Sequence, residues 1–106
     1  MIGVKFYTEA SGELRGFEIS GHAGSGDVGS DIVCAAVSSA AYLAANTITD
    51  VIQAEAQVAV EDGYLLVRVP SKETKACRVI LAGLKLHLLG LEEQYPKNIQ
   101  VSYTEV

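Results

Sequence analysis

The sequence predicts an α+β two-layer sandwich in which two helices pack on one mixed sheet, with the element order ββαββαβ. Two observations support this fold class. Two pairs of segments alternate apolar and polar residues, and each pair is followed by a long segment with apolar residues at three- and four-residue steps. A last alternating segment closes the chain. At 106 residues the length suits one domain, which we place at residues 1–106.

The first strand pair lies within residues 2–20 and forms a hairpin around a turn at residues 10–12. Both segments show the period-2 alternation that is typical of half-buried strands. Phe17 and Ile19 are the expected inward side chains of the second strand. His22 therefore follows directly after a strand end.

A helix is predicted from Asp31 to about Gln53, because small and apolar residues recur there at helical spacing. Its side chains are mostly Ala and Ser, which allow a helix to approach a sheet closely. Ser30 or Asp31 is expected to cap the N-terminus by accepting a backbone N–H. Either cap places Cys34 in the first helical turn.

A second hairpin is predicted at residues 57–61 and 64–69, joined by Asp62-Gly63 in a two-residue type I′ turn. Pro70-Ser71 then opens a second helix, which Pro96 stops. An apolar stripe along this helix predicts that it packs on the same sheet. The stripe consists of Cys77, Ile80, Leu81, Leu84, Leu88 and Leu91.

The last predicted strand runs from Asn98 to Thr104, with Ile99, Val101 and Tyr103 on one face.

Composition limits the classes of partner. The formal net charge is −5 and Lys and Arg form no cluster, which argues against nucleic acid because its affinity depends on neutralising phosphates. A basic protein or peptide is the more natural partner. The chain shows no signal peptide, and its longest apolar stretch, residues 80–91, is too short and polar to span a membrane. We therefore expect a cytoplasmic protein with no membrane partner and two free thiols.

His22 and Cys34 are the residues that point to chemistry. A thiol near a helix N-terminus or beside an imidazolium ionises more readily, and first-turn N–H groups can form an oxyanion hole. His22 could take the thiol proton and return it to a leaving amine. Asp27 and Asp31 are nearby carboxylates, and Ser38 lies one turn after Cys34 on the same helical face. Asp31 also has a structural interpretation as a cap, and Ser38 as a small packing residue.

Other interpretations of these residues are weaker. The Cys and His spacings show no paired-ligand motif, so we expect no metal and no other cofactor. The loop from Gly24 to Ser30 lacks the Gly-Lys-Ser/Thr ending of a phosphate-binding loop. A redox sensor would need Cys77 as its resolving thiol, but Cys77 falls on the apolar stripe. His87 lies beside that stripe and is expected at the surface or in an interface.

The run from Gly21 to Ser38 reads Gly-His-Ala-Gly, four residues, Gly, one residue, then Asp-Ile-Val-Cys-Ala-Ala-Val-Ser. It resembles the signature of the ribosomal-processing cysteine protease family, Prp, and the length and element order resemble that family too. The resemblance implies a homodimeric endopeptidase that removes an N-terminal extension from large-subunit ribosomal protein twenty-seven. It implies Cys34 as nucleophile and His22 as the catalytic histidine, supported by Asp31 and Ser38.

The resemblance also implies that the loop between His22 and Cys34 becomes ordered around substrate. Many family members carry aromatic residues where this chain has Ser25-Gly26-Asp27-Val28, and here only the acidic position is kept. The open alternative is a non-catalytic binding module that assists ribosome assembly. The expected substrate loop comprises Gly24, Ser25, Gly26, Asp27, Val28 and Gly29.

Overall fold

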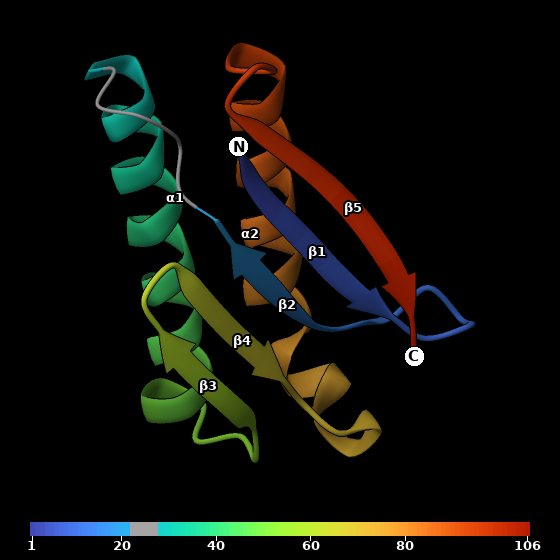
Figure 1. Cartoon of the computed structure of the whole chain (residues 1–106). Coiled ribbons are helices and arrows are strands. Elements are labelled where there is room, and N and C mark those ends of the chain that lie inside the picture. The colour runs from blue at the N-terminus through green and yellow to red at the C-terminus, as the bar shows by residue number, and fades with distance from the viewer. Residues whose placement is uncertain (22–27) are drawn as a thin grey trace.

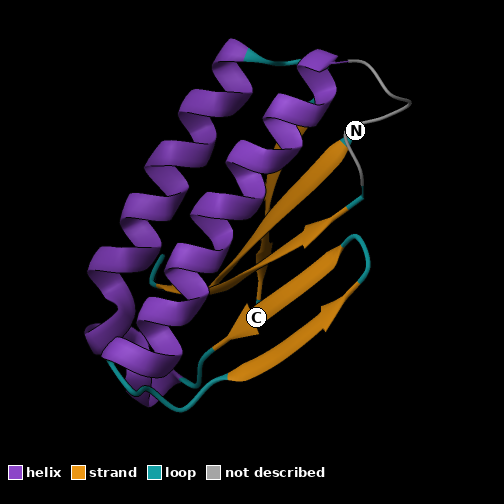
Figure 2. Cartoon of the chain, turned by 90° about the vertical axis from the view of Figure 1, so that its left-hand side faces the viewer, coloured by secondary structure: helices purple, strands orange, loops and turns teal. Residues whose placement is uncertain are grey.

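A computed structural model describes residues 1–21 and 28–106. One face of a five-stranded mixed sheet is covered by two helices, so the predicted sandwich and the order ββαββαβ are confirmed (Figure 1 and Figure 2). The strands are β1 (Ile2–Thr8), β2 (Leu14–Ser20), β3 (Gln57–Glu61), β4 (Tyr64–Arg68) and β5 (Ile99–Glu105). The helices are α1 (Val28–Asn46) and α2 (Thr74–Gln94), with a π-helical turn η1 (Thr47–Val51) after α1 and a 3₁₀ turn η2 (Ser71–Glu73) before α2.

The strand order in the sheet is β3-β4-β2-β1-β5. Both hairpins are antiparallel, β2 and β4 join them in antiparallel register, and β5 pairs parallel to β1. The helix α2 connects β4 to β5 in the chain, and Figure 1 shows that it runs behind β1 and β2. This order brings the end of β2 beside the start of β4, which determines where the candidate site forms.

The core lies between the helices and the sheet. Phe6 of β1 and Phe17 of β2 are paired in register and fully buried, with ring centroids 6.4 Å apart. Aromatic pairs across strands stabilise a sheet beyond the area that they bury. The helices contribute their predicted apolar stripes to this core. The buried residues are Val33, Val37, Ala41, Ala44 and Ala45 of α1, Ile48 of η1, and Cys77, Leu81, Leu84 and Leu88 of α2.

The start of α1 differs from the prediction. The helix begins at Val28, so Ser30 and Asp31 are helical residues rather than caps, and Cys34 lies in the second turn. The glycine-rich sequence suggested a loop through Gly29. A glycine costs only about 1 kcal/mol relative to Ala in a helix interior, and each further helical residue adds a backbone hydrogen bond.

The second hairpin turns at Asp62-Gly63 as predicted, but its type differs. Gly63 has φ 69° and Asp62 does not have a positive φ, whereas a type I′ turn requires positive φ at both central residues. The structure therefore avoids a left-handed conformation at Asp62.

Among the helices that the structure describes, only Asp31–Val51 is long and apolar enough to cross a membrane. One side of this segment is the core face of α1 and η1, which packs on the sheet. A helix that packs in a protein core can be equally long and apolar, so these two properties alone are weak evidence for a membrane span.

The burial of α2 gives a direct stability test. Leu81 is fully buried and Leu86 is 75% exposed on the same helix. We expect Leu81→Ala to lower the free energy of unfolding by about 2–5 kcal/mol, because it removes buried methyl groups and leaves a cavity. The matched variant Leu86→Ala should change it by less than about 0.5 kcal/mol. Urea unfolding of both variants measures the difference, and equal losses would contradict the packing described here.

Candidate active site

Cys34 lines a pocket of about 230 Å³ between α1 and one end of the sheet. The α1 wall includes Cys34, Ser38 and Tyr42, which follow one another at four-residue steps on one helical face. Val33 and Val37 are fully buried beside this face and fix the rotation of the helix against the sheet. Cys34 is half-buried and its thiol is free, as expected.

The opposite wall is the β3–β4 turn, with Glu61, Asp62 and Gly63. The end of β2 is tied to this turn because the backbone N–H of Gly21 donates to the carbonyl of Gly63 at 2.9 Å. Gly21 also lines the pocket. The pocket therefore lies where three segments that are distant in sequence meet: the end of β2, the second turn of α1 and the β3–β4 turn.

A polar network on the open face of the sheet holds the residue after the turn. The hydroxyl of Tyr64 donates to Glu18 Oε2 at 3.0 Å, and the hydroxyl of Tyr7 donates to the same oxygen at 3.1 Å. Lys5 Nζ lies 3.9 Å from the other oxygen of Glu18. The hydrogen bond to Glu18 raises the pKa of Tyr64, and burial followed by the same kind of bond raises the pKa of Tyr7.

The structure brings together part of the predicted site. Cys34 and Ser38 line one pocket, with the side chain of Ser38 exposed. Asp31 is exposed in the first turn of α1 and is not among the residues lining this pocket. The predicted residues His22, Gly24, Ser25, Gly26 and Asp27 lie outside the described residues, whereas Val28 and Gly29 begin α1.

Because α1 begins at Val28, Cys34 lies further from the helix N-terminus than the sequence predicted. The unpaired N–H groups of a helix belong to its first turn, and the effect of the helix dipole falls off within that turn. Cys34 lies one turn further along. The prediction that Cys34 lies in the first helical turn was therefore wrong.

Cys77 is a core residue, as predicted. It is fully buried in α2, and burial, followed by the charge of Glu73, raises the pKa of its thiol. Such a thiol is a poor resolving partner for a redox switch. His87 is exposed, and it lines a groove of about 680 Å³ on the outer surface of the two helices.

The sequence interpretation missed Tyr42, Glu61, Asp62 and Tyr64 as pocket residues. Tyr42 lies two helical turns after Cys34, so helical spacing could have identified it. The other three belong to the β3–β4 turn. Their position depends on β4 pairing with β2, and no local pattern in the sequence specifies that pairing.

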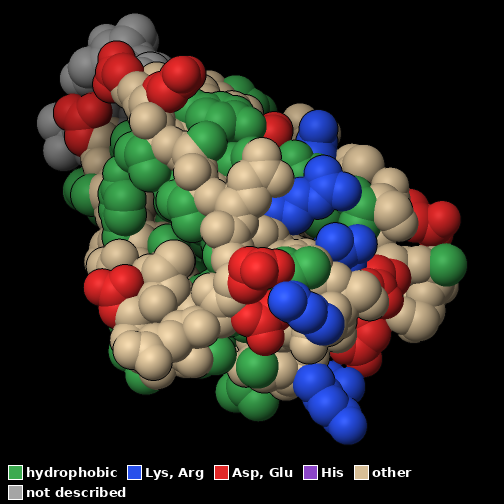
Figure 3. Space-filling view, turned by 90° about the horizontal axis from the view of Figure 1, so that it is seen from below, with side chains coloured by type: hydrophobic (Ala, Val, Ile, Leu, Met, Phe, Trp, Pro, Cys, Tyr) green, Lys and Arg blue, Asp and Glu red, His purple; other side chains and the backbone are tan. Residues whose placement is uncertain are grey.

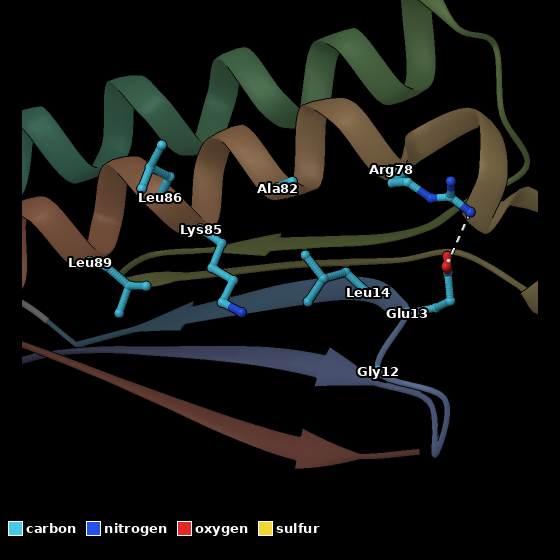
Figure 4. A pocket seen from close by; sticks show the side chains of 8 residues that line it. All are labelled: Gly12, Glu13, Leu14, Arg78, Ala82, Lys85, Leu86 and Leu89. Carbon is cyan, nitrogen blue, oxygen red and sulfur yellow. Dashed lines mark hydrogen bonds and ion pairs between the residues drawn. The ribbon is translucent and has the colours of Figure 1, made fainter.

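A further pocket, of about 530 Å³, lies between α2 and the β1–β2 turn (Figure 4). Leu14, Lys85 and Leu89 line it, and Arg78 reaches across to Glu13 at 3.1 Å. Neither this pocket nor the groove beside His87 contains a thiol among its lining residues. The described residues include no group of three or more His, Cys, Asp or Glu that could hold a metal ion.

The exposure of the two thiols predicts selective alkylation. Iodoacetamide should modify Cys34 first, because Cys77 is fully buried and its raised pKa leaves less thiolate. Peptide mapping by mass spectrometry after a short reaction measures this order, and Cys34→Ala should remove the fast modification. Rapid labelling of Cys77 in the folded protein would contradict its placement in the core.

The end of β2 gives a second prediction. Gly21 has φ 89°, and a Cβ there would lie 2.7 Å from the carbonyl oxygen of Met1. We expect Gly21→Ala to destabilise the protein by about 1–3 kcal/mol, because the left-handed conformation is strained for alanine. Gly83→Ala is the control, since a Cβ there meets nothing within 4 Å and alanine favours the helix. Thermal unfolding should show a lower Tm for Gly21→Ala and an unchanged or higher Tm for Gly83→Ala.

The chain is similar to several known proteins along nearly its whole length. A Staphylococcus aureus ribosomal processing cysteine protease Prp is 28% identical over 105 residues, covering 97% of this chain and 99% of that protein. The crystal structure of the S. aureus essential ribosomal processing protease Prp with a substrate peptide matches with a TM-score of 0.87 at 26% identity, covering 98% of this chain and 100% of that chain. The crystal structure of that protease with a covalently linked product peptide matches with a TM-score of 0.86 at 27% identity, again covering 98% of this chain and 100% of that chain.

A Streptococcus mutans crystal structure matches with a TM-score of 0.82 at 28% identity, over 100% of this chain and 96% of that chain. The family model described as cysteine protease Prp matches residues 1–100. The fold, the half-buried thiol in a pocket and these similarities agree with one another. This chain belongs to the cysteine protease Prp family.

Proposed function

We propose that this chain is an endopeptidase that removes the N-terminal extension of large-subunit ribosomal protein twenty-seven, with Cys34 as the nucleophile and His22 as the base. The observation that carries the proposal is the position of Cys34. In a chain of a cysteine protease family, it is the half-buried thiol and it lines a pocket, whereas Cys77 is enclosed in the core. The S. aureus relatives solved with a substrate peptide and with a linked product peptide support a peptide substrate.

In the proposed reaction the Cys34 thiol gives its proton to His22, and the thiolate sulfur attacks the scissile carbonyl carbon. The C–N bond then breaks, the imidazolium protonates the leaving amine, and a thioester to Cys34 remains. Water, deprotonated by His22, attacks the thioester and releases the new carboxylate and the thiol. Ser38, one turn along the same face, is proposed to hydrogen-bond within the pocket, and Asp31 is proposed to orient His22.

The proposal includes contact between the substrate and residues 24–27, which precede α1. It also includes a cytoplasmic homodimer. Exposed apolar side chains on both helices are available for self-association. Ile32, Leu43 and Val79 are 57%, 65% and 84% exposed.

Peptide cleavage tests the proposal. A peptide that spans an aromatic-rich extension and the first residues of the mature ribosomal protein should be cut once by the parent chain. Cys34→Ala should remove cleavage completely, since no other described thiol lines the pocket. His22→Ala should lower kcat by at least about a hundredfold, because general base catalysis is lost. Mass spectrometry of the products locates the cut.

The matched control is Cys77→Ala, which removes the other thiol and should keep cleavage if the variant folds. Circular dichroism establishes that each variant retains its fold. If Cys34→Ala binds the peptide as the parent does and the parent never cuts it, the chain is a binding module and the proposed activity is wrong.

A further inference from the structure

We infer that the pocket between α2 and the β1–β2 turn is a second ligand site, which binds a small apolar molecule that carries one carboxylate, of the class of a medium-chain fatty acid. The carboxylate of the ligand would pair with the ammonium group of Lys85, and its apolar body would lie between α2 and Leu14. This pocket and the pocket that contains Cys34 share no lining residue. The inference therefore goes beyond the proposed protease activity and does not depend on it.

The size and the lining of this pocket are typical of small-ligand sites. Its volume of about 530 Å³ lies within the range of about 300–1,000 Å³ that such sites occupy. Its apolar wall combines Leu14 of β2 with Ala82, Leu86 and Leu89 of α2, and Figure 4 shows the side chain of Leu14 pointing toward the helix. An apolar body binds there because its surface leaves water, and a few polar groups fix its orientation.

This apolar wall is separate from the face of α2 that packs in the core. Leu81 and Leu88 are fully buried, whereas Leu86 is exposed and Leu89 is only partly buried. Packing of the core therefore does not account for Leu86 and Leu89. A ligand in the pocket would remove part of their apolar surface from water, which is favourable.

The charges at the pocket favour an anion. Its lining residues include two cations, Arg78 and Lys85, and one carboxylate, Glu13. Arg78 forms an ion pair with Glu13 at 3.1 Å, at one end of the pocket (Figure 4). Lys85 forms no ion pair with any residue that the structure describes. The pocket therefore keeps one positive charge without a carboxylate partner, in a chain whose formal net charge is −5.

Lys85 is held at the pocket by an aromatic contact rather than by a carboxylate. Its Nζ lies 5.1 Å from the centroid of the Tyr103 ring, and that ring stacks on Phe6 with the centroids 6.3 Å apart. A cation–π contact leaves the positive charge in place. Other cations are neutralised directly, since in the view from below several Lys and Arg side chains lie beside Asp or Glu (Figure 3). A ligand carboxylate therefore meets a charge that is already positioned.

An NMR titration with octanoate tests the inference. Backbone amide shifts should move saturably at Leu14, Lys85, Leu86 and Leu89, at octanoate concentrations below those that form micelles. Octanol, which lacks the carboxylate, should bind about twofold to fivefold more weakly, which is the factor that one partly exposed ion pair contributes. Acetate, which lacks the apolar chain, should not bind measurably. Raising the salt concentration should weaken the binding of octanoate and not that of octanol.

Two variants with matched controls locate the site. Lys85→Gln should reduce the affinity for octanoate to that for octanol, whereas Lys75→Gln makes the same change at an exposed residue of α2 that does not line the pocket and should have no effect. Ala82→Phe should remove binding because it fills the pocket. Ala76→Phe makes the equal change at another exposed alanine of α2 and should leave binding intact. Circular dichroism establishes that each variant keeps its fold.

Saturable shifts at this pocket, with a preference for octanoate that depends on Lys85, support the inference. Equal binding of octanoate and octanol to the parent chain, unchanged binding in Ala82→Phe, or no saturable shift overturns it. Shifts that centre on the groove beside His87 also overturn it, because Lys85 does not line that groove. None of these outcomes decides whether the chain cleaves peptides.

Discussion

The close contact between α1 and the sheet is the constraint on which the site depends. Small buried side chains, Ala41 and Ala44, together with Val33 and Val37, allow the helix to lie directly on the strands. That contact fixes the rotation of α1 and turns the face with Cys34 toward the end of the sheet. With larger side chains on this face, the helix would stand further away and the pocket would lose one wall.

The strand order supplies the other wall. Because β4 pairs with β2, the β3–β4 turn lies beside the point where the chain leaves β2 toward His22. The backbone bond between Gly21 and Gly63 ties these two loop ends together. A small sheet and one helix thus bring the thiol of Cys34, the end of β2 and the β3–β4 turn to a single pocket.

Local patterns predicted most of the fold, because alternation and helical spacing depend on neighbouring residues. They predicted Cys34 and Ser38 on one helical face for the same reason. They failed at Val28–Ser30, where glycine suggested a loop although helix continuation costs little. They also assigned a left-handed conformation to Asp62 that the turn avoids. Glu61, Asp62 and Tyr64 could not be predicted as pocket residues, since their position depends on non-local strand pairing.

Covalent trapping of the nucleophile tests the central claim most directly. A peptide that ends in a chloromethyl ketone at the cleavage position should label Cys34 alone, at a rate far above that of a chloromethyl ketone without the peptide. Intact-mass and peptide-mapping measurements identify the labelled residue. Labelling of Cys34 that depends on the peptide and slows in His22→Ala is the result that the account predicts. Equal rates with and without the peptide, or labelling at Cys77, would contradict it.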